Sequence, residues 1–119
     1  MDEHLDRVIK ATIESIVDGY SPEKIVLHGS FARGDWHEGS DLDLIIIKET
    51  GDRFADRIEK VLDVCPGGIA VEPLVYTPHE VSQMLAEGND FLRTALEKGV
   101  VVYERERPGS SKMAGTGQV

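Results

Sequence analysis

The apolar positions along this chain follow two spacings, one typical of helices and one typical of strands. Apolar residues three and four apart predict helices over 3–18 and 52–64, from Pro78 to Gly88, and from Asn89 or Asp90 to Gly99. Short apolar runs bounded by turn residues predict strands over 24–28, 41–47, 69–76 and 100–104. Strands and helices therefore intermix on a small sheet, and the expected fold class is α/β or α+β. The pattern does not determine the order of the strands.

Local signals refine several of these elements. Gly19 is expected to end the first helix, and residues 30–34 are expected to form one helical turn. Thr77-Pro78-His79-Glu80 has the composition of a capping box at a helix start. The charged residues between 48 and 60 are expected to form a solvated helix face. The residues of the second helix expected to face the core are Phe54, Ile58, Val61 and Leu62.

Length and composition predict one domain and a tail. The chain has 119 residues, of which 40% are hydrophobic, enough for a single modest core over residues 1–104. Residues 105–119 include a Gly/Ser-rich stretch without apolar periodicity, and we predict that they form a disordered C-terminal tail. No apolar run approaches the roughly 18 residues of a membrane span. The acidic N-terminus and a single cysteine, Cys65, favour a cytoplasmic protein.

The charge of the chain restricts its partners. The formal net charge is −9, so a basic docking face for nucleic acid is not expected, because phosphate neutralisation supplies most of the affinity in such complexes. An acidic chain favours divalent cations at clustered carboxylates, and a basic protein partner.

Three acidic residues point to a metal site. Asp41 and Asp43 lie two apart on a predicted strand, so both side chains point to one face of the sheet. Adjacent carboxylates are costly to ionise without a counter-charge, and oxygen ligands suit Mg²⁺ or Mn²⁺. Glu72 is the only charged residue in an apolar strand. If the two strands are neighbours, Glu72 joins the two aspartates in the type of cluster that two-metal transfer uses.

A small-residue turn ahead of these acids is a candidate phosphate site. Gly29 lets the backbone approach a phosphate closely, and Ser30 offers a hydroxyl at a helix start, where free N–H groups favour anions. Arg33 lies one turn further along and could contact the same phosphate. Ser40 directly precedes Asp41 and could brace the entry to the strand.

Each of these signals has a plain structural alternative. A Gly-Ser turn alone is usually a loop, and Asp-Leu-Asp on a strand is usually an exposed edge. Glu72 could be a solvent-facing edge residue, because Pro73 beside it favours edge strands. His28, next to the turn, is expected to pack and not to take part in catalysis. The joint occurrence of the turn, the spacer, the paired aspartates and the late carboxylate favours a site.

These residues resemble a known signature. Gly-Ser, ten residues, Asp41-Leu42-Asp43 and then Glu72 resemble the pattern of the DNA polymerase β-like nucleotidyltransferase superfamily. More narrowly, Gly-Ser-Phe-Ala-Arg-Gly-Asp followed by Ser-Asp-Leu-Asp-Leu resembles the minimal nucleotidyltransferases, also called the MNT or MntA-like group. The resemblance extends over residues 5–104.

The resemblance implies a mixed sheet flanked by helices, with a site on one sheet face that uses Mg²⁺ and a nucleoside triphosphate, most often ATP. By this resemblance, Gly29 and Ser30 correspond to the phosphate-binding turn of the family, and Asp41 and Asp43 correspond to its metal ligands. Glu72 falls at the third acid, where the family usually has aspartate. In several members this domain pairs with a helical HEPN protein as the antitoxin of a toxin–antitoxin system, and transfers AMP to a tyrosine of the toxin.

Two hypotheses follow from the sequence. In the first, the chain is a metal-dependent nucleotidyltransferase that moves a nucleoside monophosphate to an acceptor hydroxyl, using Asp41, Asp43 and Glu72. In the second, it is a non-catalytic protein-binding antitoxin or partner module with a vestigial nucleotide site. The residues leave the acceptor open among a protein tyrosine, a small molecule and an RNA end.

Overall fold

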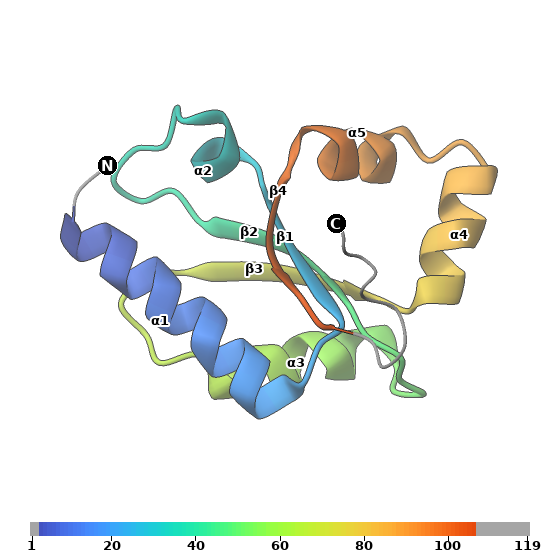
Figure 1. Ribbon diagram of the computed structural model, residues 1–119, viewed down its shortest axis with the longest axis horizontal. Helices are drawn as coiled ribbons and strands as arrows, with labels where there is room; N and C mark the ends of the chain where they lie inside the picture. Colours follow the sequence, from blue (N-terminus) through green and yellow to red (C-terminus); the bar gives the residue numbers. More distant parts are fainter. Residues whose placement is uncertain (1–2, 107–119) are drawn as a thin grey trace.

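The fold is built on four strands, with helices on both faces of the sheet (Figure 1). The computed structural model describes residues 3–106. The expected α+β class is confirmed. In chain order the elements are α1 Glu3–Tyr20, β1 Lys24–His28, α2 Ser30–Arg33, β2 Leu42–Ile47, α3 Phe54–Val64, β3 Val71–Tyr76, α4 Pro78–Ala86, α5 Asp90–Lys98 and β4 Val100–Glu104.

The strand order, which the sequence pattern left open, is β3-β2-β1-β4. β1 pairs antiparallel with both β2 and β4, whereas β2 and β3 are parallel. β3 is thus an edge strand, which explains how Pro73 fits within it without a backbone N–H. The parallel pair needs a crossover, and α3 supplies it between β2 and β3.

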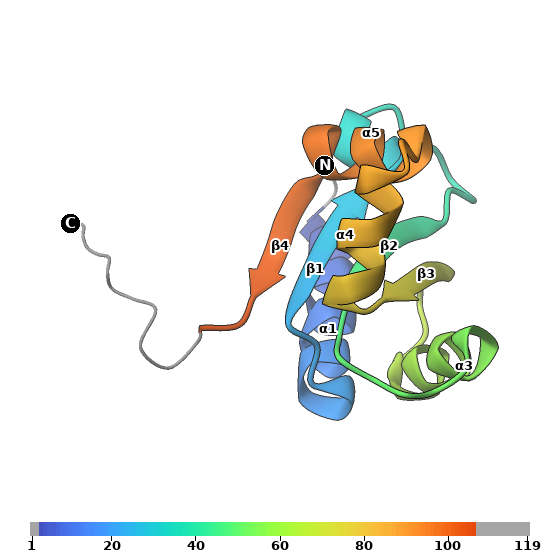
Figure 2. The ribbon, with the colours of Figure 1, turned by 90° about the vertical axis from the view of Figure 1, so that its right-hand side faces the viewer.

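Alternation along the strands divides the core into two layers. Leu42, Leu44 and Ile46 of β2 point to the layer covered by α1 and α3, and all three are fully buried. Ile45 points to the opposite layer, where α4 and α5 cover it with Leu92 and Ala95. Figure 2 shows α4 in front of the sheet and α1 behind it. Asp43 alternates with the leucines, so it lies on the face that α4 and α5 cover.

The first helix is longer than predicted. Gly19 does not end α1, which continues to Tyr20, and the positive φ of 54° at Ser21 follows it. A methyl group on Gly19 would lie 2.7 Å from Val64 Cγ1. The glycine therefore permits close packing between α1 and α3, and its role in the sequence is not that of a helix stop.

The inward face of α3 was predicted correctly only in part. Val61 is fully buried and Ile58 is partly buried, as expected. Phe54 and Leu62 are instead 41% and 45% exposed, whereas Arg57 is only 7% exposed. The Arg57 guanidinium donates to both carboxylate oxygens of Glu80, at 2.7 and 3.1 Å, and to the carbonyl oxygens of Val75 and Asp52. Burial of this charge is tolerated because all three guanidinium nitrogens donate to acceptors.

The helix starts around α4 and α5 follow the predicted chemistry. The capping box is formed: the Glu80 N–H donates to Thr77 Oγ1 at 3.1 Å, and the Thr77 N–H donates to the Glu80 carboxylate at 2.9 Å. Of the two candidate caps for α5, Asn89 takes the position, and its Oδ1 accepts from the Leu92 N–H at 2.8 Å.

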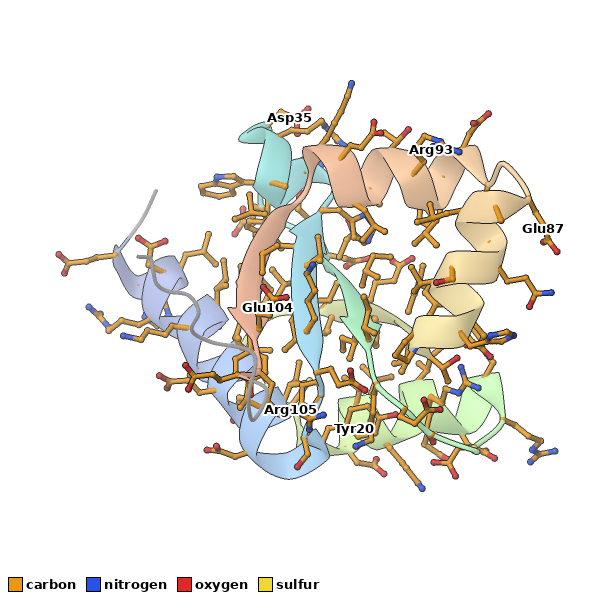
Figure 3. The ribbon with its side chains drawn as sticks, turned by 45° about the vertical axis from the view of Figure 1, so that its right-hand side comes forward. Tyr20, Asp35, Glu87, Arg93, Glu104 and Arg105 are labelled. Carbon is orange, nitrogen blue, oxygen red and sulfur yellow. The ribbon has the colours of Figure 1, made fainter. Side chains whose placement is uncertain are left out.

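The last described residues continue the domain beyond β4. The Arg105 N–H donates to the Glu23 carbonyl at 2.8 Å, and Figure 3 shows Arg105 at the end of β4 remote from α2 and α5. The predicted disorder of the rest of the tail concerns residues 107–119, which lie outside the described residues. Within residues 3–106, no helix is long and apolar enough to cross a membrane.

Candidate active site

A cleft of about 720 Å³ opens beside the sheet, on the face that α4 and α5 cover. Its walls come from the end of β1, the turn into α2, the first halves of β2 and β3, and the length of α5. The lining residues are His28, Gly29, Ala32, Arg33, Asp43, Glu72, Leu74, Asp90, Phe91, Thr94, Ala95, Lys98 and Gly99.

The strand register brings the predicted acids together. Asp43 and Glu72 are direct partners in the parallel pair of β2 and β3, so their side chains leave adjacent strands on the same face. Asp41 directly precedes β2, and its carboxyl interacts with that of Glu72. The condition that these two strands are neighbours is therefore met, although Glu72 also lies exposed on an edge strand.

The acids influence one another's protonation. The interaction with Asp41 raises the pKa of Glu72 above its usual value, and the negative charge of Asp43 raises it further. Burial raises the pKa of Asp43, with a smaller contribution from Asp41, while His28 and Arg33 act in the opposite direction. Negative charge at these positions is thus costly in the unliganded protein, and a bound cation would relieve that cost.

Gly29 fits the turn against the acids. Its φ of 75° and ψ of −155° belong to a region that other residues rarely adopt, and a methyl group at this position would overlap Asp43 Oδ2. Ser30 is the first residue of α2, with Gly29 as its N-cap. The two parts of the sequence motif therefore contact one another in the fold: the backbone of the turn lies against the Asp43 carboxylate.

The other two predicted nucleotide-binding residues differ in position. Arg33 lines the cleft, and its Nε donates to Asp35 at 3.2 Å on an exposed surface. Ser40 does not line the cleft: its Oγ accepts from the His37 N–H at 2.9 Å and closes the turn before β2. It borders a separate hollow of about 500 Å³, where the rings of Phe31 and Trp36 stack with centroids 5.7 Å apart.

Asp41, Asp43 and Glu72 are the candidate metal ligands, but together they do not form a complete three-ligand site. Among residues 3–106, no group of three or more His, Cys, Asp or Glu side chains is arranged to hold a metal ion. Mg²⁺ usually binds through one or two carboxylates and completes its shell with water and substrate phosphates. An all-oxygen donor set at the edge of an open cleft, with the electrostatic cost described above, fits that mode of binding.

Sequence reasoning missed the wall formed by α5. Phe91, Thr94 and Lys98 line the cleft opposite the acids, and their spacing places them on one side of the helix. His28 also borders the cleft, with its ring edge-on to Phe91 at a centroid distance of 5.8 Å. The helical spacing was visible in the sequence, but only the tertiary fold determines which side of α5 meets the acids.

This geometry can be compared with known proteins. The family model described as "Polymerase beta, Nucleotidyltransferase" matches residues 11–108, a range that contains the turn, all three acids and α5. The chain belongs to the polymerase beta nucleotidyltransferase family. The resemblance inferred from the motif is confirmed, and the chain is a nucleotidyltransferase.

One curated relative supports this assignment, and one solved structure shares the fold. A protein of Methanocaldococcus jannaschii, named as a candidate protein adenylyltransferase, is 28% identical over 105 residues, which cover 82% of this chain and 97% of the relative. A crystal structure of a candidate nucleotidyltransferase from Sulfolobus solfataricus superposes with a TM-score of 0.54 at 21% identity, covering 84% of this chain and 89% of the other. The second likeness concerns the fold.

Proposed function

We propose that this nucleotidyltransferase moves AMP from ATP to an acceptor hydroxyl, using Asp41, Asp43 and Glu72 as its catalytic and metal-binding acids. The register pair of Asp43 and Glu72, set against the Gly29 turn, is the observation that carries the proposal. In the reaction, the acceptor oxygen forms a bond to the α-phosphorus, the bond to the bridging oxygen breaks, and pyrophosphate leaves with that oxygen.

The residues around the cleft have distinct roles in this proposal. Asp41 and Asp43 hold a divalent cation, Mg²⁺ or Mn²⁺, together with the triphosphate. Glu72 binds a second cation or assists removal of the acceptor proton. The turn at Gly29 and Ser30, with Arg33 beside it, holds the β- and γ-phosphates. When bound, the metal would supply positive charge that stabilises the pentacoordinate transition state.

The acceptor in this proposal is a protein side chain. The name of the Methanocaldococcus jannaschii relative presents it as a candidate protein adenylyltransferase, which favours AMP and a protein target. The net charge of −9 favours a basic protein over nucleic acid. We propose a tyrosine of a helical HEPN-type toxin as the acceptor, so that the chain acts as an antitoxin.

The test is transfer to a purified helical partner encoded beside this chain. The wild-type protein and the variant Asp41→Asn/Asp43→Asn are each incubated with ATP, Mg²⁺ and the partner, and the mass of the partner is measured. The asparagine variant keeps the shape of both side chains, so the fold should be retained. We expect a mass increase of one AMP with the wild type and none with the variant.

The same experiment separates the non-catalytic alternative. If both proteins neutralise the toxin equally and neither changes its mass, the chain acts by binding alone. Melting curves of the two proteins, recorded in EDTA, verify that the variant is folded. The variant should melt at the same or a slightly higher temperature, because the clustered negative charge has been removed.

A further inference from the structure

The wall of the cleft opposite the acids is one side of α5. Phe91, Thr94, Ala95 and Lys98 line it at helical spacing, while Asp43 and Glu72 face it from the sheet. Phe91 and Lys98 are seven residues apart, which is about 10 Å along a helix axis. The two ends of the wall could therefore contact different parts of one nucleoside triphosphate.

The end of the wall at Phe91 is aromatic and accessible. Phe91 is 51% exposed, unlike its neighbour Leu92, which is fully buried in the core. Its ring packs edge-on against the His28 ring, at an interplanar angle of 80°. An exposed ring at a cleft offers a surface on which a nucleobase can stack, and Thr94 one turn later adds a hydroxyl.

The other end of the wall is cationic and adjacent to the phosphate-binding turn. Gly99 approaches the end of β1 so closely that a methyl group on it would lie 2.8 Å from the Leu27 carbonyl oxygen, which places Lys98 near the start of the Gly29 turn. Figures 1 and 2 show α2 beside the C-terminal end of α5. Two cations line the cleft, Arg33 and Lys98.

These two cations differ in what they contact. Arg33 pairs with Asp35 at 3.2 Å, whereas Lys98 forms no salt bridge within residues 3–106. The acids lining the same cleft are Asp43, Glu72 and Asp90. A bound triphosphate would add further negative charge to this surface. The ammonium group of Lys98 is a cation of the cleft that is available to pair with that charge.

We infer that α5 orients the nucleotide in the cleft, with the Lys98 ammonium on the β- and γ-phosphates and the Phe91 ring against the nucleoside. The inference rests on the proposed function and extends it to residues outside the sequence motif. Lys98 and Phe91 are positioning residues: they fix the α-phosphate near the three acids by holding both ends of the substrate. Each end should then contribute affinity for a different part of the ligand.

The test compares the binding of ATP and AMP by calorimetry in the presence of Mg²⁺. Lys98→Met keeps the aliphatic stem and removes the charge, so affinity for ATP should fall about tenfold while affinity for AMP changes less than about twofold. Phe91→Leu should weaken ATP and AMP equally, by about tenfold, because both carry the base. Arg93→Met on α5 and Phe54→Leu on α3, both outside the cleft, are the matched controls and should bind as the wild type does.

Three outcomes separate this inference from the function on which it rests. If Lys98→Met or Phe91→Leu binds ATP as tightly as the wild type does, the role assigned to that end of the wall is overturned. Equal losses of affinity for ATP and AMP in Lys98→Met would also overturn it, because the lysine would then not contact the terminal phosphates. A wild-type protein that binds no ATP would overturn the proposed function, and this inference with it.

Discussion

Gly29 is the residue at which the motif in the sequence and the geometry of the site coincide most closely. The sequence marked it as a glycine that allows a phosphate to approach the backbone. In the structure it has a φ of 75°, and its α-carbon lies against the Asp43 carboxylate. No local signal indicated the second constraint, because Asp43 lies on a different strand and reaches Gly29 only through the pairing of β1 with β2.

Replacing this glycine should damage the site more than the fold. We expect Gly29→Ala to reduce nucleotidyl transfer by at least about 100-fold, because the methyl group displaces the Asp43 carboxylate, which the proposed reaction uses, by a substantial part of an ångström. Gly34→Ala is the matched control: its φ is 87°, but no atom lies within 4 Å of the added methyl group. It should cost about 1–2 kcal/mol of unfolding free energy and leave transfer intact. Equal loss of transfer in both variants would contradict this account.

At the scale of the elements, the connection between α3 and α4 depends on one buried charge. Glu80 completes the capping box of α4 and also accepts two of the hydrogen bonds from the Arg57 guanidinium. The sequence predicted the box correctly because it is local. It predicted a solvated face for α3 because an arginine between acidic residues usually lies at the surface, and the acceptors that bury it come from Val75 and Glu80, far along the chain.

The stability contributed by this connection should depend on pH in a definite direction. The hydrogen bonds from Arg57 hold the pKa of Glu80 below its usual value. The contribution is therefore present above the unfolded carboxyl pKa, about 4.3, and is lost as the pH falls through the lower folded pKa. Urea unfolding of the wild type and of Glu80→Gln should give a clear difference in unfolding free energy at pH 7 and a smaller one near pH 3.

The control for this prediction is Glu87→Gln, at the exposed end of α4 (Figure 3). This variant should match the wild type at both pH values, since the Glu87 side chain is exposed and the residue caps α4 through its backbone N–H, which the substitution keeps. A difference between wild type and Glu80→Gln that is the same at pH 7 and pH 3 would show that ionisation of Glu80 does not contribute to the connection.

For the molecule as a whole, the sequence predicted most of the elements but not their assembly. β1 and β4 have the predicted bounds, and β2 and β3 differ only at their starts. The strand order and the position of α5 across the cleft depend on contacts between distant segments, which no local spacing encodes. The sequence grouped Glu72 with the aspartates only on the condition that their strands are neighbours, and the parallel pairing of β2 and β3 meets that condition.

The C-terminal segment should not contribute to this assembly. The contacts of Arg105 with Glu23 precede residue 108, so deleting residues 108–119 should leave the melting temperature within about two degrees of the full chain. Affinity for ATP with Mg²⁺ should also be unchanged. A fall in melting temperature of more than a few degrees would show that the segment packs on the domain.

The central claim is that the acids at the Gly29 turn bind a nucleotide through a divalent cation. Calorimetric titration with a non-hydrolysable ATP analogue, with Mg²⁺ or with EDTA, tests it without requiring the acceptor. We expect binding with Mg²⁺, a loss of affinity of at least about tenfold in EDTA, and a similar loss in Asp41→Asn/Asp43→Asn even when Mg²⁺ is present. Equal affinity in Mg²⁺ and EDTA, or an unchanged affinity in the double variant, would contradict the account.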